Sequence, residues 1–176
     1  MKPVLDATCG SKMIWFDPKN PLALFVDNRE VDNRKIYDGK DGKRYLTVKP
    51  DVVADFKHLP FEDDSFYLVV FDPPHLISGG DNGWQVQKYG RLPKDWETEL
   101  RAGFAECMRV LKRFGTLVFK WSEVQIPVSK VIEAVGGGVY FPLFGCCGAK
   151  QAFLHRNSIK YRSSGAKQTF LHLFFL

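Results

Sequence analysis

The sequence predicts an α/β fold, in which a mostly parallel, doubly wound sheet carries helices on both faces. Three observations support this prediction. Short apolar runs of strand length alternate with segments of helical period. Three early runs each end in a carboxylate, at Asp6, Asp27 and Asp55. The chain has 176 residues, the size of one domain, so residues 1–176 are expected to form a single unit.

Apolar runs bounded by turn residues define the expected strands. The first four are expected at residues 3–8, 22–26, 51–55 and 66–71, and a fifth at residues 116–121. Two later runs, residues 139–141 and 169–175, complete the set. Since consecutive parallel strands need crossover connections, helices are expected between several of them.

Helical spacing is clearest after residue 93, where every third or fourth residue is large and apolar. The residues of this face are Trp96, Leu100, Phe104, Met108 and Leu111. A second helix is expected at residues 127–135, ended by the glycines at 136–138. Residues 12–16 are expected to begin a short helix that Pro18 breaks, and residues 76–92 to form a loop.

Two polar segments are expected to lie outside the core of the fold. Residues 34–49 contain two Asp-Gly pairs between apolar residues, which predicts a hairpin insertion. Residues 146–168 are expected to form a basic loop, because no acidic residue follows Glu133 while cations continue. A segment of one sign is often simply solvated, but a phosphate backbone selects the same pattern. Because acids are absent as well as bases present, this distribution, more than the net charge of +5, favours nucleic acid.

Composition argues against several classes of protein. No apolar run has the length of a membrane span, and Asp6 comes too early for a secretory signal. The four cysteines form no CxxC pair and have no zinc-binding spacing, so no metal is expected. We therefore expect a cytoplasmic protein with reduced thiols and no membrane partner.

The stretch Asp72, Pro73, Pro74 and His75 directly follows the fourth expected strand. Two prolines remove backbone donors and stiffen the chain, which leaves carbonyl acceptors beside a carboxylate and a flat ring. Such a site suits a planar amino group whose nitrogen is to be attacked from elsewhere. Taken alone, the motif is equally well explained as a turn, since Asp-Pro commonly opens one.

The acids at the strand ends indicate a ligand crevice. Carboxyl ends of parallel strands meet at one edge of a sheet, so Asp6, Asp27, Asp55 and Asp72 are expected to converge there. A dinucleotide site would need G-x-G-x-x-G, and residues 8–12 contain a single glycine. The spacing of a P-loop is missing as well.

Taken together, these residues resemble the class I S-adenosylmethionine-dependent methyltransferases, and within them the amino-methylating branch with a D/N-P-P-aromatic motif. Residues 6–11 (Asp-Ala-Thr-Cys-Gly-Ser) look like the family's D-P-F-C-G-S-G loop, residues 59–66 like its LPF-x-D-x-SF segment, and residues 72–75 like its catalytic motif. Two positions depart from the pattern: Lys12 replaces a glycine, and His75 replaces the usual Tyr, Phe or Trp.

The resemblance implies a Rossmann-like, seven-stranded mixed sheet with an antiparallel last strand, and it implies roles for particular residues. The implied catalytic residues are Asp72, Pro73, Pro74 and His75. S-adenosyl-L-methionine is the implied cofactor, bound by Asp6, Ala7, Thr8, Cys9, Gly10, Asp27, Asp55 and Phe56. Substrate contacts are expected from Trp84, Lys88, Tyr89, Arg91, Lys150, Arg156, Lys160 and Arg162.

The expected reaction is methyl transfer to an exocyclic amino nitrogen of a nucleic-acid base, with adenine in DNA as the first choice over RNA. An RNA base, a small molecule or a protein amide remain alternatives, as does a non-catalytic, cofactor-binding subunit or nucleic-acid-binding partner. We expect a monomer or homodimer, with a partner that supplies target recognition as a further option.

Overall fold

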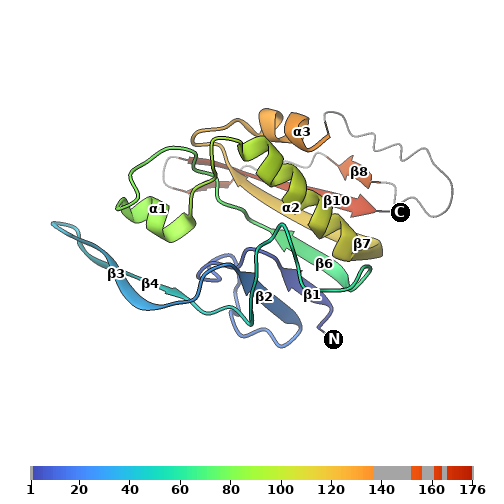
Figure 1. Cartoon of the computed structure of the whole chain (residues 1–176), viewed down its shortest axis with the longest axis horizontal. Coiled ribbons are helices and arrows are strands. Elements are labelled where there is room, and N and C mark those ends of the chain that lie inside the picture. The colour runs from blue at the N-terminus through green and yellow to red at the C-terminus, as the bar shows by residue number, and fades with distance from the viewer. Residues whose placement is uncertain (1, 137–151, 156–160, 164–165, 176) are drawn as a thin grey trace.

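The computed structural model describes residues 2–136, 152–155, 161–163 and 166–175. Within them, the main sheet has the strand order β5-β2-β1-β6-β7-β10-β8, with β9 paired to β10 (Figure 1). The strands that run parallel are β1 (Val4–Asp6), β2 (Ala23–Asp27), β5 (Val52–Val53), β6 (Phe66–Phe71) and β7 (Leu111–Ser122). An α/β fold on a mainly parallel sheet is therefore confirmed.

The far edge of the sheet is antiparallel. Strand β10 (Ala166–Phe175) runs antiparallel to β7, and both β8 (Ala152–His155) and β9 (Tyr161–Ser163) pair antiparallel with β10. The described residues thus place eight strands on the sheet where seven were expected. The two additional strands fall in the segment 146–168, which was expected to be a loop. The strand expected at residues 139–141 lies outside the described residues.

Three helices occur in the described residues. Helix α2 (Trp96–Val110) connects β6 to β7, and α3 (Val128–Gly136) follows β7 and packs against α2. Helix α1 (Trp84–Tyr89) is a single short helix inside the segment expected to be a loop. Within the described part of the chain, no helix has the length and apolar character needed to cross a bilayer.

Residues 12–16 do not form the expected helix, and the two faces of the sheet are covered differently as a result. Lys12 has a left-handed backbone (φ 56°), which is incompatible with the first turn of a helix. The segment instead lays Trp15 edge-on against Phe25 of β2, with ring centroids 5.2 Å apart. This face of β2 therefore carries a loop and a small apolar cluster, whereas helices on both faces were expected.

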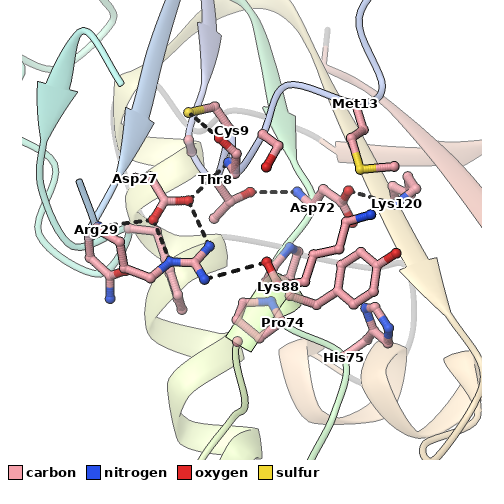
Figure 2. A pocket seen from close by; sticks show the side chains of 18 of the residues that line it. Thr8, Cys9, Met13, Asp27, Arg29, Asp72, Pro74, His75, Lys88 and Lys120 are labelled. Carbon is pink, nitrogen blue, oxygen red and sulfur yellow. Dashed lines mark hydrogen bonds and ion pairs between the residues drawn. The ribbon is translucent and has the colours of Figure 1, made fainter. Parts of the chain in front are cut away.

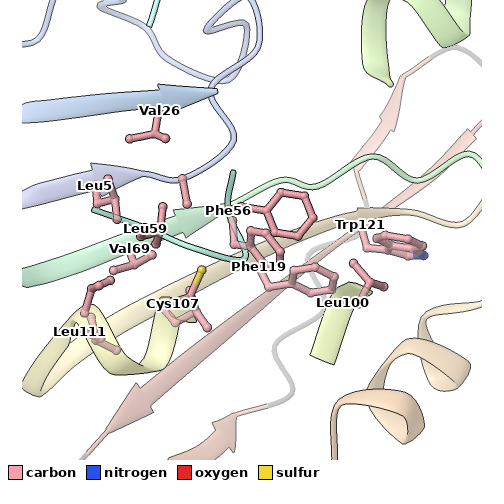
Figure 3. Close-up of a cluster of buried hydrophobic side chains, with 14 of the residues drawn as sticks. Leu5, Val26, Phe56, Leu59, Val69, Leu100, Cys107, Leu111, Phe119 and Trp121 are labelled. Carbon is pink, nitrogen blue, oxygen red and sulfur yellow. The ribbon is translucent and has the colours of Figure 1, made fainter. Parts of the chain in front are cut away.

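The other face holds the main core, between the sheet and helices α2 and α3 (Figure 3). Its largest side chains include Phe71, Phe119 and Trp121, all at most 1% exposed. Helix α2 approaches the sheet closely at Gly103, where a Cβ would lie 2.6 Å from the Phe56 ring and 2.8 Å from that of Phe71. The glycine therefore sets the depth at which α2 packs, beside the carboxyl ends of the strands.

Strands β3 (Val31–Gly39) and β4 (Gly42–Val48) form a separate antiparallel hairpin over the residues where an insertion was expected. It extends away from the body of the molecule, beyond α1 (Figure 1). One side of its base is apolar: Ile36, Leu46 and Val48 are buried, with Val31 and Trp84 packed against them. The base of the hairpin thus packs against α1.

Candidate functional site

A cavity of about 390 Å³ opens at the carboxyl ends of the parallel strands. It lies beside β1 and β6. Strands β2 and β5 are added on one side of β1 and strands β6 and β7 on the other, so the strand order reverses at this point. Open α/β sheets bind their ligands at this point. The volume falls in the range of about 300–1,000 Å³ that small-molecule sites occupy.

The turn after β1 forms one wall of the cavity (Figure 2). Ala7 N–H donates to Val70 O of β6 (2.9 Å), and Cys9 N–H donates to Val26 O of β2 (2.7 Å), so both neighbouring strands hold the turn. Gly10 has φ 49°, a left-handed conformation that glycine tolerates without strain. Its N–H donates to Asp27 Oδ2 (2.9 Å), which joins the turn to the end of β2.

The residues 72–75 form the opposite wall. Asp72 N–H donates to the hydroxyl oxygen of Thr8 (2.8 Å), which fixes this segment relative to the turn after β1. Asp72 Oδ2 pairs with Lys120 Nζ at 2.6 Å, while none of the described residues donates a hydrogen bond to Oδ1. Burial raises the pKa of the Asp72 carboxyl, and the Lys120 ammonium opposes that rise. One oxygen of Asp72 therefore remains available as an acceptor in the cavity.

His75 presents an uncharged ring. Burial, and to a lesser degree the positive charge of Lys120, lower its pKa from 6.5 to about 4. The imidazole is neutral at pH 7 and lies 5.4 Å, centroid to centroid, from the Tyr89 ring and 6.4 Å from that of Trp121. His75 and Tyr89 therefore supply two rings to the cavity that Asp72 also lines, and the buried Trp121 supports His75 from behind.

Asp27 is already fully engaged. Its Oδ1 accepts hydrogen bonds from Arg29 N–H (3.0 Å) and Arg29 Nε (2.9 Å), and its Oδ2 from Gly10 N–H and Arg29 Nη2 (3.2 Å). These four contacts match the number of acceptor positions on a carboxylate. Arg29 Nη1 also donates to the carbonyls of Gln87 and Lys88 at 3.3 and 3.5 Å, which ties α1 to the end of β2.

Asp6 lies behind the cavity wall instead of facing the cavity. It is fully buried, and its carboxyl accepts hydrogen bonds from Trp15 Nε1 (2.6 Å) and Thr8 N–H (3.2 Å). Burial raises its pKa from 3.8 to about 7, more than these two hydrogen bonds lower it. Asp6 thus supports the turn after β1 from inside the fold.

The structure brings most of the expected site residues together around one cavity. Those that line it are Ala7, Thr8, Cys9, Gly10, Asp27, Phe56, Asp72, Pro73, Pro74, His75, Lys88, Tyr89 and Arg91. Three others do not: Asp6 is buried behind the turn, Asp55 accepts from Lys57 beyond the end of β5, and Trp84 packs on the hairpin. Lys150, Arg156 and Lys160 lie outside the described residues, and Arg162 is on β9.

Several lining residues were not expected from the sequence, and two of them, Arg29 and Lys120, are charged. Lys120 has a recognisable signal, because it is a lone cation inside an apolar strand and such a charge needs a buried partner. Arg29 has none, since a charged residue two positions after a strand is ordinary. The described residues contain no cluster of three or more side chains that could hold a metal ion.

Comparison with known proteins gives no assignment. No family model matches the chain, and no curated protein matches it significantly.

Proposed function

We propose that this chain is an S-adenosylmethionine-dependent methyltransferase that methylates an exocyclic amino nitrogen of a nucleic-acid base, with adenine in DNA as the first substrate to test. The observation that carries the proposal is that Asp72, Pro73, Pro74 and His75 face the same cavity as the glycine turn after β1. The acceptor chemistry and a ligand-binding turn are thus on opposite walls of one site. The sheet order, with its antiparallel β10, supports the Rossmann-like fold that this activity would use.

The residues present are compatible with the cofactor. Gly10 and its neighbours would approach the ligand by backbone, Phe56 supplies an apolar wall, and Asp27 is the carboxylate for ribose hydroxyls. Because all acceptor positions of Asp27 are filled, Arg29 would have to swing away or share the carboxylate. S-adenosylmethionine, when bound, supplies an electrophilic methyl group on a sulfonium.

The chain's own residues would then prepare the nucleophile. The lone pair of an exocyclic amine is delocalised into its ring, so the amine is a weak nucleophile. Asp72 Oδ1 and the Pro73 carbonyl would each accept one N–H hydrogen bond, which favours a pyramidal nitrogen and aims its lone pair. The neutral His75 ring would stack on the base, and a base in duplex DNA would have to be flipped out to reach it. Positioning and exclusion of water would supply most of the rate.

The test is transfer of radiolabelled methyl groups to unmethylated DNA, total RNA and a protein extract, with Asp72→Ala beside the parent chain. We expect label in one nucleic acid and a loss of at least about 100-fold in the variant, the scale of removing one preorganised polar contact in a transition state. Cofactor affinity, measured by calorimetry, should change little. Asp95→Ala, at an exposed position outside both the cavity lining and the β3–β4 hairpin, is the matched control and should keep the parent rate. An Asp72→Ala variant that methylates as fast as the parent would refute the assignment.

A further inference from the structure

The β3–β4 hairpin is attached to the turn after β1 and to helix α1, both of which contribute residues to the cavity. Ser11, which lines the cavity, donates from its hydroxyl to the Thr47 carbonyl of β4 (2.9 Å). On the other side, the Arg44 guanidinium lies 4.1 Å from the centre of the Trp84 ring, at the start of α1. Helix α1 carries Lys88 and Tyr89 into the cavity. The hairpin base is therefore held next to the mouth of the site.

The hairpin has more cations than carboxylates. Between residues 31 and 49 the chain has three carboxylates, and two of them are paired with lysines, as Lys35–Asp38 and Lys49–Asp32. The segment has six cations: Arg34, Lys35, Lys40, Lys43, Arg44 and Lys49. All six are exposed. The exposed hairpin therefore carries a net positive charge.

An exposed aromatic ring lies among these cations. Tyr45 is 55% exposed and pairs in register with Lys35 on β3. Lys43 is two positions away on β4, so it is on the same side as Tyr45. Cations beside an exposed aromatic ring on an extended ribbon suit a nucleic-acid strand, since the cations bind phosphates and the ring contacts sugar or base. A two-stranded ribbon also has the width that the major groove of DNA admits.

We propose that the β3–β4 hairpin is the arm that binds the phosphate backbone of the nucleic-acid substrate next to the target base. This inference rests on the proposed function and adds to it a location for substrate binding. Contacts of this kind fix the register of the substrate on the protein and carry no sequence information by themselves. The target base would reach the cavity from the strand that the hairpin holds.

The test variant is Arg34→Gln, Lys40→Gln and Lys43→Gln combined, which removes three exposed cations that have no carboxylate partner among the described residues. It leaves the Ser11–Thr47 and Arg44–Trp84 contacts in place. The matched control is Lys19→Gln, Arg113→Gln and Lys130→Gln, three exposed cations elsewhere that are outside the cavity lining. Both variants change the net charge equally. The measurement is anisotropy of a labelled, unmethylated 20-base-pair duplex and of its single strands, at a series of salt concentrations.

We expect the hairpin variant to bind at least about tenfold more weakly than the control. In a plot of the logarithm of the binding constant against the logarithm of the salt concentration, the slope for the variant should be shallower by about 0.9 for each duplex phosphate that it no longer neutralises. Cofactor affinity, measured by calorimetry, should equal that of the parent, because the hairpin contributes no residue to the cavity lining.

The outcomes separate this proposal from the proposed function. If the hairpin variant binds nucleic acid like the control while the parent methylates it, the arm is refuted and the function stands. If the hairpin variant alone loses binding and no preparation is methylated, the arm stands and the function falls. A parent chain that binds no nucleic acid refutes both.

Discussion

Asp6 makes the stability of this protein depend on pH in an unusual direction. Its carboxyl is fully buried beneath the turn after β1, and burial raises its pKa from 3.8 to about 7. The folded chain therefore keeps the proton over a range in which the unfolded chain has released it. We expect the free energy of unfolding to fall as the pH rises from about 4 to about 7, in contrast to an ion-paired carboxylate.

The size of the effect follows from the two pKa values. A difference of about 3 units corresponds to about 4 kcal/mol, at about 1.4 kcal/mol for each unit. Below about pH 4 the carboxyl is protonated in both states, so it makes no pH-dependent contribution to stability there. Above about pH 7 it is ionised in both states, and the full destabilisation is present.

Substituting Asp6→Asn removes the titrating group and keeps the side-chain shape. Denaturant unfolding of the parent and the variant from pH 4 to pH 8 measures the difference between them. We expect that difference to shift by about 4 kcal/mol in favour of the variant across this range. Asp41→Asn at the exposed hairpin tip is the control for loss of a carboxyl that is not buried. Parallel stability curves for the parent and Asp6→Asn would refute the reasoning.

Two further predictions concern the site and its support. Replacing Lys120→Met removes the cation that opposes the raised pKa of Asp72, so the acidic limb of the rate–pH profile should move to higher pH. Lys120→Arg keeps the charge and should move that limb less. Superimposable profiles of the parent and Lys120→Met would contradict this role for Lys120. Replacing Gly103→Ala places a methyl group 2.6 Å from the Phe56 ring. We expect the free energy of unfolding to fall by about 1–3 kcal/mol, which thermal unfolding would show as a lower melting temperature. A melting temperature at or above that of the parent would mean that α2 can shift without cost.

Local sequence signals located the central strands and the long helix. The apolar run 66–71 is bounded by Ser65 and Asp72, and β6 has the same limits. Helix α2 follows the spacing of Trp96, Leu100, Phe104 and Met108, because a helix places these four residues on one face, and that face packs against the core. Because Asp72 directly follows the last residue of β6, the limits of this strand place Asp72 at the carboxyl edge of the sheet.

Other parts depended on pairings between residues far apart in the chain. The basic character of residues 146–168 predicts a loop, but β10 supplies backbone hydrogen-bonding partners for residues 152–155 and 161–163 within that segment. The pairing of Lys120 with Asp72 spans 48 positions and arises only when β7 aligns with β6. Asp55 was expected at a strand end, but β5 stops at Val53 and the carboxylate turns toward Lys57.

The position of Arg29 has a consequence for the order in which ligands bind. One guanidinium holds both the Asp27 carboxylate and the last carbonyls of α1, the helix that carries Lys88 and Tyr89. A ligand that replaces Arg29 as the partner of Asp27 would also weaken the hydrogen bonds from Arg29 to α1. Two binding events that involve the same side chain are coupled, and the coupling is reciprocal. Occupancy of the cavity beside β2 and the position of α1 are therefore linked through a single residue, so a ligand that contacts Asp27 and a ligand that contacts α1 would not bind independently of each other.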